Sequence, residues 1–321
     1  MAKKLTLIIF AVLAALCLCG CGTKSEDAGT KKITIAYQYG MAYAPMTVMR
    51  EQNLIEKYYG EPITVEWAQL NSGSAINEGI ITGSIDAGAM GIAPAITGML
   101  KGISYKIFSA VSAQPQVLMT HNDSLSSLSD FTSENKIALV NIGSIQHIML
   151  AMAAKEELGD AHALDNNIVA MSHPDGMSAL LSGAADAQLT TAPYVYKERG
   201  QEGIGELDAI EKVWPEGSTF IVGVASEKVH EDGKLYQALV DAMDEAQEFL
   251  SNNKEAAAEL LCGSEGVTAE VMLEWLNDPA CIYSAETKGV TRMARFMVDE
   301  GFAEGTLEGF SQLAYDNVAG D

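Results

Sequence analysis

The chain has 321 residues, of which 48% are hydrophobic and 20% charged, so it can bury the core of one large or two ordinary domains and is not a disordered protein. Its formal net charge of −23 repels phosphate backbones and anionic lipid surfaces, which excludes nucleic acid as a partner. The charge does not set the sign of a small ligand, because backbone N–H groups can bind an anion inside an acidic protein.

Residues 1–20 predict a secretory signal peptide. Two lysines precede an apolar run, Leu5–Leu18, that is shorter than the roughly 20 residues of a membrane-spanning helix. Residues 18–21 resemble a bacterial lipobox with an unusual cysteine at the second position, and predict lipidation of Cys21 as the first residue of the mature chain; an ordinary cleaved signal is the alternative. Residues 21–32 then form a polar, lipidated tether. We therefore expect a protein anchored by lipid at the extracytoplasmic face of the cell membrane.

Strands alternate with helical runs, which is typical of a mostly parallel α/β sheet. The expected strands are Lys32–Tyr37, Ile63–Trp67, one after Gly83, Tyr105–Val111, Gln116–Thr120, Lys136–Asn141, Ile168–Ser172, one after Gly183, and Thr219–Ala225. The expected helices include Pro94–Lys101, Ile145–Leu158, Lys234–Asn253, Glu255–Leu261, Thr268–Leu276 and Thr287–Gly301, with a loosely helical segment at Asp123–Glu134. The absence of a Gly/Pro-rich linker predicts two short crossover strands between lobes, which would permit hinge closure.

One pattern occurs twice. A helical run is closed by Gly83 and followed by Asp86, a short strand and a tail of small residues, and the same order recurs at Gly183 and Asp186. A glycine that ends a helix in the left-handed conformation explains both copies. Two equivalent loops predict two similar lobes that present the carboxyl ends of strands to a shared crevice. Chance recurrence in a chain rich in alanine and glycine is the alternative.

The loops at strand ends supply the candidate ligand-binding residues. Small residues in both repeat tails would let a ligand approach the backbone closely. A strand running through Gly143 and Ser144 into a helix would place free N–H groups at the crevice, where they favour a negatively charged group, although a simple serine-capped turn is the alternative. We expect Tyr39 and Tyr194 in the crevice, whereas Tyr37 and Trp67 belong to strands and to the core.

Enzyme signatures are missing: the chain has no GxSxG, GxxxxGK[ST], HExxH or strand-following GxGxxG motif. The five histidines are scattered, so no metal site or cofactor is predicted. His147 could touch a ligand, but a core or surface position is the better interpretation. Asp86 and Asp186 are expected to have a structural role. Cys262 and Cys281 form one disulfide or remain two free thiols.

Three stretches and the tail resemble one known family. Residues 32–60, 71–102, 179–198 and 287–317 are similar to the substrate-binding lipoproteins of the nitrate/sulfonate/taurine class of ABC importers. The resemblance implies a two-lobed type II periplasmic-binding-protein fold with two crossover strands, with lobe 1 at 31–113 and 219–321 and lobe 2 at 114–218. It also implies a small-molecule ligand, ABC permease and ATPase partners, and a monomer.

Carried over by position, the resemblance and the loops together assign one ligand site. Its residues are Gln38, Tyr39, Ser72, Gly73, Met90, Gly91, Ile92, Gly143, Ser144, Thr190, Thr191 and Tyr194. We expect Ser72, Met90, Ser144 and Thr190 to converge on one shared cavity. Many relatives have Gly-Asp-x-Pro where this chain has Gly-Ile-Ala-Pro at residues 91–94, which leaves the ligand open.

The sequence thus predicts a solute-binding lipoprotein that carries a small organic anion of the sulfonate, taurine or nitrate type. The alternative within the same fold is a pyrimidine or thiamine-precursor binder, which stacking rings would favour. A pyrimidine-synthase-like enzyme is a weak alternative, because the mature chain lacks that branch's cysteine cluster. A ligand-sensing ectodomain is the remaining alternative.

Overall fold

The computed structural model describes residues 30–321. The predicted signal peptide (1–20), the lipidation site Cys21 and the tether up to residue 29 lie outside the described residues. Within the described part, the longest helices are too short or too polar to cross a bilayer.

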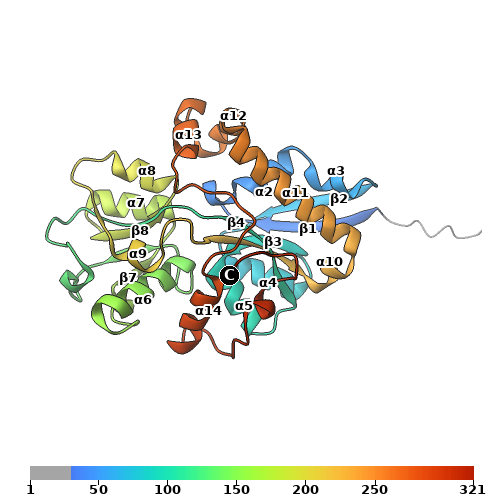
Figure 1. The fold of residues 1–321 in the computed structure, drawn as a ribbon. Coiled ribbons are helices and arrows are strands. Elements are labelled where there is room, and N and C mark those ends of the chain that lie inside the picture. The colour runs from blue at the N-terminus through green and yellow to red at the C-terminus, as the bar shows by residue number, and fades with distance from the viewer. Residues whose placement is uncertain (1–29) are drawn as a thin grey trace, which may run out of the picture. The chain divides into compact units, whose positions relative to one another are not determined.

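Two five-stranded mixed sheets form the framework (Figure 1). The first sheet has the order β2-β1-β3-β10-β4, and the second has the order β7-β6-β8-β5-β9. The strands are β1 (Lys31–Tyr37), β2 (Ile63–Gln69), β3 (Ala87–Gly91), β4 (Tyr105–Ser112), β5 (Gln116–Thr120), β6 (Ile137–Leu139), β7 (Ile168–Ala170), β8 (Ala187–Thr191), β9 (Gly205–Leu207) and β10 (Ile221–Ser226). The expected two-lobed α/β architecture is confirmed.

The two sheets match strand for strand. In the first, β1 and β3 are parallel, and β10 runs antiparallel to both β3 and β4. In the second, β6 and β8 are parallel, and β5 runs antiparallel to both β8 and β9. The strand that enters the second sheet, β5, therefore occupies the place that the returning strand β10 occupies in the first. The predicted return of the chain at Thr219–Ala225 is confirmed.

Helices cover the faces of both sheets. They are α2 (Ala44–Glu51), α3 (Leu54–Tyr59), α4 (Gly73–Thr82), α5 (Ile92–Leu100), α6 (Ile145–Leu158), α7 (His173–Ser182), α8 (Tyr194–Arg199), α9 (Ala209–Val213), α10 (Glu227–Glu231), α11 (Gly233–Asn252), α12 (Lys254–Glu265), α13 (Ala269–Leu276), α14 (Val290–Asp299) and α15 (Phe310–Leu313). Short 3₁₀ turns lie at η1 (Met41–Tyr43), η2 (Leu128–Asp130) and η3 (Asp165–Asn167). The segment Asp123–Glu134, expected to be loosely helical, contains only η2, whose serine and aspartate form a capping box.

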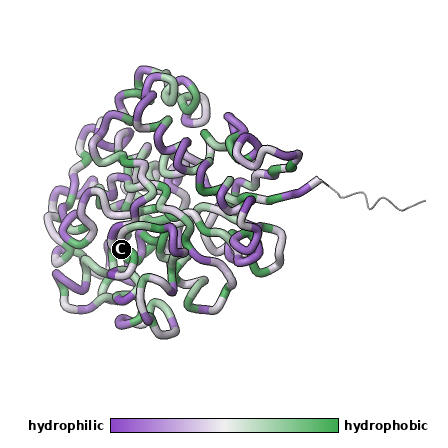
Figure 2. Tube along the Cα trace, turned by 45° about the vertical axis from the view of Figure 1, so that its right-hand side comes forward, coloured by the Kyte–Doolittle hydropathy of each residue, from purple (hydrophilic) through white to green (hydrophobic). Residues whose placement is uncertain are grey.

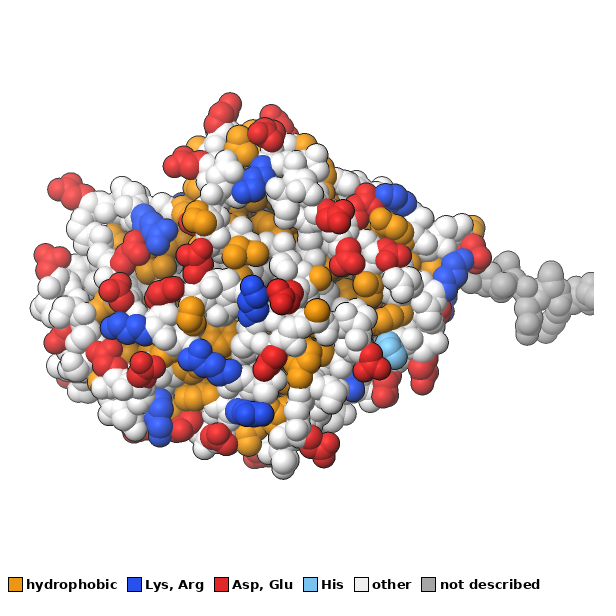
Figure 3. All heavy atoms as spheres, in the orientation of Figure 1, with side chains coloured by type: hydrophobic (Ala, Val, Ile, Leu, Met, Phe, Trp, Pro, Cys, Tyr) orange, Lys and Arg blue, Asp and Glu red, His pale blue; other side chains and the backbone are white. Residues whose placement is uncertain are grey.

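The core lies between the sheets and these helices. Ile33 and Ile35 of β1 and Phe108 of β4 are fully or almost fully buried, and the long helix α11 packs on α2 and α3. Figure 2 shows hydrophobic residues concentrated in the interior of the trace and hydrophilic residues toward its outside. Figure 3 shows acidic side chains spread over the visible face among fewer basic ones, as the net charge of −23 requires.

The predicted repeat is confirmed at the level of single hydrogen bonds. Gly83 and Gly183 end α4 and α7 with φ of 72° and 75°, in the left-handed region where glycine is favoured. The carboxylate of Asp86 accepts the backbone N–H of Thr34, and that of Asp186 accepts the N–H of Lys136, at 2.9 and 2.8 Å. Asp86 therefore joins the start of β3 to the middle of β1, and Asp186 joins the start of β8 to the residue before β6. This is the structural role expected for the pair.

The two copies of the repeat also differ in where they place a glycine: on the strand in the first copy and on the helix in the second. In the first copy, a Cβ on Gly88 would lie 3.2 Å from the Ile76 side chain. In the second copy, glycine occupies the helix position instead, and a Cβ on Gly176 would lie 2.8 Å from the side chain of Gln188. The helix can therefore pack closely on its strand in both lobes because one member of each pair lacks a side chain.

A third segment pairs with the crossover between the sheets. Ala113, between β4 and β5, exchanges two backbone hydrogen bonds of 2.9 Å with Ile282. Beside it, the amide of Gln114 contacts the buried Cys281 thiol at 3.3 Å. Cys281 and Cys262 are both free thiols in the structure.

Replacing Asp186 with asparagine is expected to lower the free energy of unfolding by about 1 to 2 kcal/mol at pH 7, because the Lys136 N–H loses a charged acceptor. Burial opposes ionisation of Asp186, but the N–H of Lys136 and the side-chain amides of Asn135 and Asn122 hold its pKa below the usual range. The carboxylate therefore stabilises the fold above the unfolded pKa of about 4, and this contribution is lost as the pH falls through the lower folded pKa.

Urea unfolding at pH 7 measures the loss. The matched control is Asp123→Asn, which alters an exposed aspartate. Equal losses of stability in the two variants would contradict the role assigned to Asp186.

Candidate functional site

A cavity of about 700 Å³ lies between the two sheets. Its wall from the first half of the chain comes from the segment after β1, the start of α4, the end of β3 and the start of α5. Its wall from the second half comes from the starts of α6 and α7 and the end of β8, and α12 and α13 contribute four further residues, Leu261, Ser264, Glu265 and Met272. The carboxyl ends of the parallel strands thus meet at this cavity, as open α/β sheets require of a ligand site.

Seven of the twelve sequence-predicted residues line the cavity: Gln38, Tyr39, Gly73, Gly91, Ser144, Thr191 and Tyr194. The other five, which are Ser72, Met90, Ile92, Gly143 and Thr190, are not part of its wall. Of the four residues expected to converge, only Ser144 lines the cavity, and each of the other three is one position away from a residue that does.

Strand parity explains two of these differences. Neighbouring residues of a strand point to opposite faces, so the last residue of β3 or β8 faces the cavity while the one before it faces the core. Met90 and Thr190 are accordingly fully buried, and the Thr190 hydroxyl contacts the Glu198 carboxyl at 3.3 Å. Ile92 is fully buried in the first turn of α5.

The remaining two differences come from local hydrogen bonds. The Ser72 hydroxyl is turned into its own helix, where it accepts the N–H of Ala75 at 3.2 Å. Gly143 has φ of 79° and donates its N–H to Nδ1 of His147 at 3.1 Å, so this amide is not available to a ligand. His147 itself is 4% exposed and is not part of the wall, so of the two positions expected for it, core or surface, it occupies the core.

Among the helices that begin at the cavity, α4, α6 and α7 are each capped by a serine. Ser72, Ser144 and Ser172 accept the backbone N–H three residues ahead of them, at 3.2 to 3.4 Å. The hydroxyl of each cap satisfies one of the N–H groups in the first turn of its helix. The caps therefore fix where α4, α6 and α7 start, on two different sheets.

The other N–H groups of these first turns have no acceptor inside the helix. They belong to residues of the cavity wall, namely Gly73 and Ser74 in α4, Ile145 and Gln146 in α6, and His173 in α7. Since the N-terminus of a helix also carries about half a positive charge, the three helix starts give the cavity an electrostatic preference for an anion.

Formal charge in the wall is sparse. Among the lining residues, Arg50 is the single basic residue and Glu265 is the single acidic residue. Arg50 donates to the Tyr37 hydroxyl and to the Glu51 carboxylate, the latter at 2.7 and 2.9 Å. Burial raises the pKa of Glu265, and the nearby Lys197 ammonium opposes that shift. Sequence reasoning missed Arg50, because it reaches the cavity from the last turn of α2 rather than from a strand-end loop.

An aromatic pair forms part of the wall. The His173 ring stacks on Tyr194 with centroids 5.4 Å apart and planes 21° apart. Burial lowers the pKa of His173 to about 4, so the ring is neutral at pH 7, and its Nδ1 is buried without a hydrogen-bond partner. Tyr39 projects from the other lobe and is 62% exposed. The predicted cavity positions of Tyr39 and Tyr194 agree with this arrangement, whereas Tyr37, expected only in the core, also reaches the wall.

Polar side chains join the wall to the crossover strand behind it. The Gln116 amide donates to the Thr191 hydroxyl at 2.7 Å, and Gln146 donates to Gln116 Oε1 at 3.3 Å. The described residues contain no group of three or more His, Cys, Asp or Glu side chains placed to hold a metal ion. The cavity therefore offers amides, hydroxyls and aromatic faces, which suit binding of an organic solute.

Comparisons with known proteins agree with this geometry. A model of the NMT1-like family matches residues 26–262. A curated Escherichia coli (strain K12) protein named as an aliphatic sulfonates-binding protein is 23% identical over 273 residues, which cover 84% of this chain and 83% of that protein.

Two solved structures share the fold. The periplasmic aliphatic sulphonate binding protein SsuA from Escherichia coli has a TM-score of 0.69 and 20% identity, over 91% of this chain and 94% of that one. The alkanesulfonate-binding protein SsuA from Xanthomonas axonopodis pv. citri bound to MOPS has a TM-score of 0.69 and 18% identity, over 91% and 96%. The resemblance inferred from the sequence is confirmed, and these relatives are named as binding proteins and not as enzymes.

The folded protein is expected to lose stability between pH 6.5 and pH 4 through His173. The unfolded chain binds a proton on this residue below its ordinary pKa of about 6.5, whereas the folded chain does so only near its pKa of about 4. The contribution of His173 is therefore complete above the higher value and falls by about 1 kcal/mol per pH unit between the two.

Urea unfolding of the wild type and His173→Gln between pH 7 and pH 5 measures this contribution. The variant should lack that part of the pH dependence. A slope that the substitution leaves unchanged would contradict the buried, neutral state of His173.

Proposed function

The chain belongs to the NMT1-like family, and we propose that it is the extracytoplasmic solute-binding component of an ABC importer, with a small organic anion as its ligand. One observation supports a negatively charged ligand: residues from three helix starts, one on the first lobe and two on the second, line one cavity, and their first-turn N–H groups have no acceptor in the helix. Such N–H groups and the helix dipole favour negative charge even in an acidic protein.

Cavity size and lining favour an organic ligand over a small inorganic ion. A volume of about 700 Å³ lies within the range of about 300–1,000 Å³ that is typical of small-molecule sites. Apolar side chains contribute to the wall, including Met41, Phe220, Leu261 and Met272. An alkyl or cyclic sulfonate would use both parts, with its anionic head at the helix starts and its body on the apolar surface. The relatives named for binding sulfonates support this ligand class.

We propose lobe 1 at 31–113 and 219–321 and lobe 2 at 114–218, joined by the crossovers into β5 and β10. A ligand that contacts amides of both lobes binds the closed arrangement more tightly than an open one, so it shifts the population toward closure. The closed, loaded protein would then deliver the solute to permease and ATPase subunits as a monomer. Lipidation at Cys21 would keep it at the outer face of the membrane.

A planar heterocycle of the pyrimidine type is the second candidate ligand. The observation in its favour is the stacked pair His173 and Tyr194 in the wall, since an aromatic face can hold a flat ring by stacking. An uncharged heterocycle would not need hydrogen bonds from the helix starts. Comparing charged with uncharged ligands therefore distinguishes the two candidates.

The substitution Ser74→Pro tests the anion site directly, because proline removes the N–H of one first-turn residue of α4. Proline occupies the equivalent position of α7, at Pro174, so a helix start of this repeat accepts it. We expect the affinity for ethanesulfonate or MOPS to fall by about 10-fold or more, as a hydrogen bond to a charged group is worth roughly 1.5–3 kcal/mol. Isothermal titration calorimetry provides the measurement.

The matched control is Ser74→Ala, which keeps the N–H and removes only the hydroxyl of an exposed side chain. Its affinity should stay within about threefold of the wild type, a change of less than about 0.7 kcal/mol. Nitrate, taurine and a pyrimidine complete the ligand panel. Binding of the uncharged pyrimidine without any binding of sulfonates would overturn the proposed ligand class.

A further inference from the structure

The start of α6 depends on a side chain that does not line the cavity. Residues 141–144 form a turn in which the N–H of Ser144 bonds to the carbonyl of Asn141 at 3.1 Å. Gly143 occupies the third position of this turn with φ of 79°, a conformation that favours glycine. The turn leads directly into Ser144, Ile145 and Gln146, which are the three residues that bring α6 to the cavity wall.

The His147 side chain, in the first turn of α6, bonds back to this loop. Its Nδ1 accepts the N–H of Gly143 at 3.1 Å, while its backbone N–H donates to the Ser144 hydroxyl at 3.2 Å. The pair resembles a capping box, in which the third residue of the helix reaches back to the chain before it. Here the reach extends one residue further, to the glycine that precedes the cap.

The bond from Gly143 fixes the state of the imidazole. A nitrogen that accepts an N–H cannot carry a proton, so Nδ1 is bare and the proton of neutral His147 sits on Nε2. Nε2 faces the Asp165 carboxylate at 3.4 Å, an acceptor that suits this tautomer. Burial lowers the pKa of His147, although Asp165 opposes the shift, and the ring is therefore neutral at pH 7.

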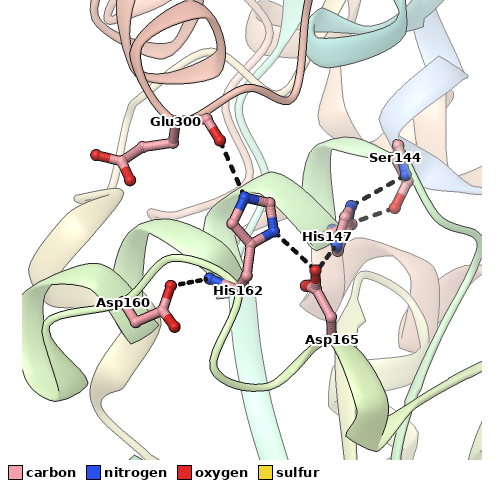
Figure 4. A network of polar contacts seen from close by, with 7 residues as sticks. Ser144, His147, Asp160, His162, Asp165 and Glu300 are labelled. Carbon is pink, nitrogen blue, oxygen red and sulfur yellow. Dashed lines mark hydrogen bonds and ion pairs between the residues drawn. The ribbon is translucent and has the colours of Figure 1, made fainter.

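Figure 4 shows the surroundings of the ring. The titratable groups that face His147 are Asp165 and His162. Asp165 also accepts from His162 at 2.7 Å, and the other ring nitrogen of His162 bonds to the Glu300 carbonyl at 2.9 Å. The Phe302 ring packs on both imidazoles, with centroids 5.3 and 4.5 Å away. His147 is thus held on one side by the segment after α14 and holds the turn at the cavity on the other.

We propose that His147 is a positioning residue of the ligand site, which uses its unprotonated Nδ1 to fix Gly143 so that the first-turn amides of α6 face the cavity. This inference rests on the proposed anion-binding function. It assigns no contact between His147 and the ligand, since the side chain lies behind the wall.

Two substitutions separate positioning from simple packing. His147→Asn keeps an oxygen acceptor close to the place of Nδ1 but shortens the side chain and gives up the contact with Asp165. His147→Leu also gives up the contact with Asp165 and offers Gly143 no acceptor, but it keeps most of the buried volume. We expect the leucine variant to have a higher thermal midpoint than the asparagine variant, because it fills the buried volume, but to bind ethanesulfonate about 5- to 10-fold more weakly than the wild type. The asparagine variant should have a lower midpoint and an affinity within about threefold of the wild type.

If His147 positions the site, the more stable variant, His147→Leu, should bind more weakly than the less stable variant, His147→Asn. If affinity follows stability in both variants, His147 acts only through packing and the proposal is wrong. The pH profile gives a further check, because a sulfonate keeps its charge across this range. Wild-type affinity should decline when acid protonates Nδ1, at a pH below the ordinary pKa of a histidine because burial lowers the pKa of His147, whereas protonation of His173 near pH 4 would raise affinity for an anion.

Measurements on the protein without ligand test the role of His147 independently of the proposed function. Exchange of the Gly143 amide, followed by NMR, should be slow in the wild type and in His147→Asn and fast in His147→Leu. The ¹⁵N shifts of the wild-type imidazole should report the Nε2–H tautomer at pH 7. Failure of all sulfonates to bind would reject the function alone, whereas an Nδ1–H tautomer or fast Gly143 exchange in the wild type would reject the positioning role.

Discussion

The constraint on which this structure depends is that the first turn of a helix leaves backbone N–H groups without acceptors. Three helices with such unpaired N–H groups begin at one cavity. In each of them a serine, Ser72, Ser144 or Ser172, accepts only one of these N–H groups. The rest must be satisfied by water or by a ligand. Because α4 comes from one lobe and α6 and α7 from the other, a ligand that satisfies them also holds the two lobes together.

The repeated architecture explains why such a cavity arises between the sheets. Each lobe pairs its strands in the same order, and the crossing strands β5 and β10 run antiparallel to both of their neighbours in equivalent places. Asp86 bonds to Thr34 within β1 and Asp186 to Lys136 just before β6, so each aspartate ties its strand to the parallel neighbour. The helix that precedes each aspartate begins at the cavity, so the repeat delivers one capped helix from each side.

Features that depend on local backbone chemistry could be read from the sequence. The glycines that end α4 and α7, the paired aspartates and the returning strand are all set by residue type and short spacing, and they lie where they were expected. The candidate site was less predictable. A shift of one residue reverses the direction of a strand side chain, and Met90 and Thr190 consequently point into the core while Gly91 and Thr191 reach the cavity. Arg50 was found only in the structure, because it reaches the cavity from α2, whereas Gln146 and His173 lie in the first turns of α6 and α7, directly beside predicted strand ends.

A crystal structure of the protein with 2-bromoethanesulfonate tests the central claim most directly, since the bromine and the sulfonate can be located independently. We expect a sulfonate whose oxygens lie about 3 Å from backbone nitrogens of both lobes, among them those of Ser74 in α4 and of Gln146 or His173 in α6 and α7, with the bromine on the apolar wall. A sulfonate bound outside the cavity, or bound within it without contact to any first-turn amide, would contradict the account.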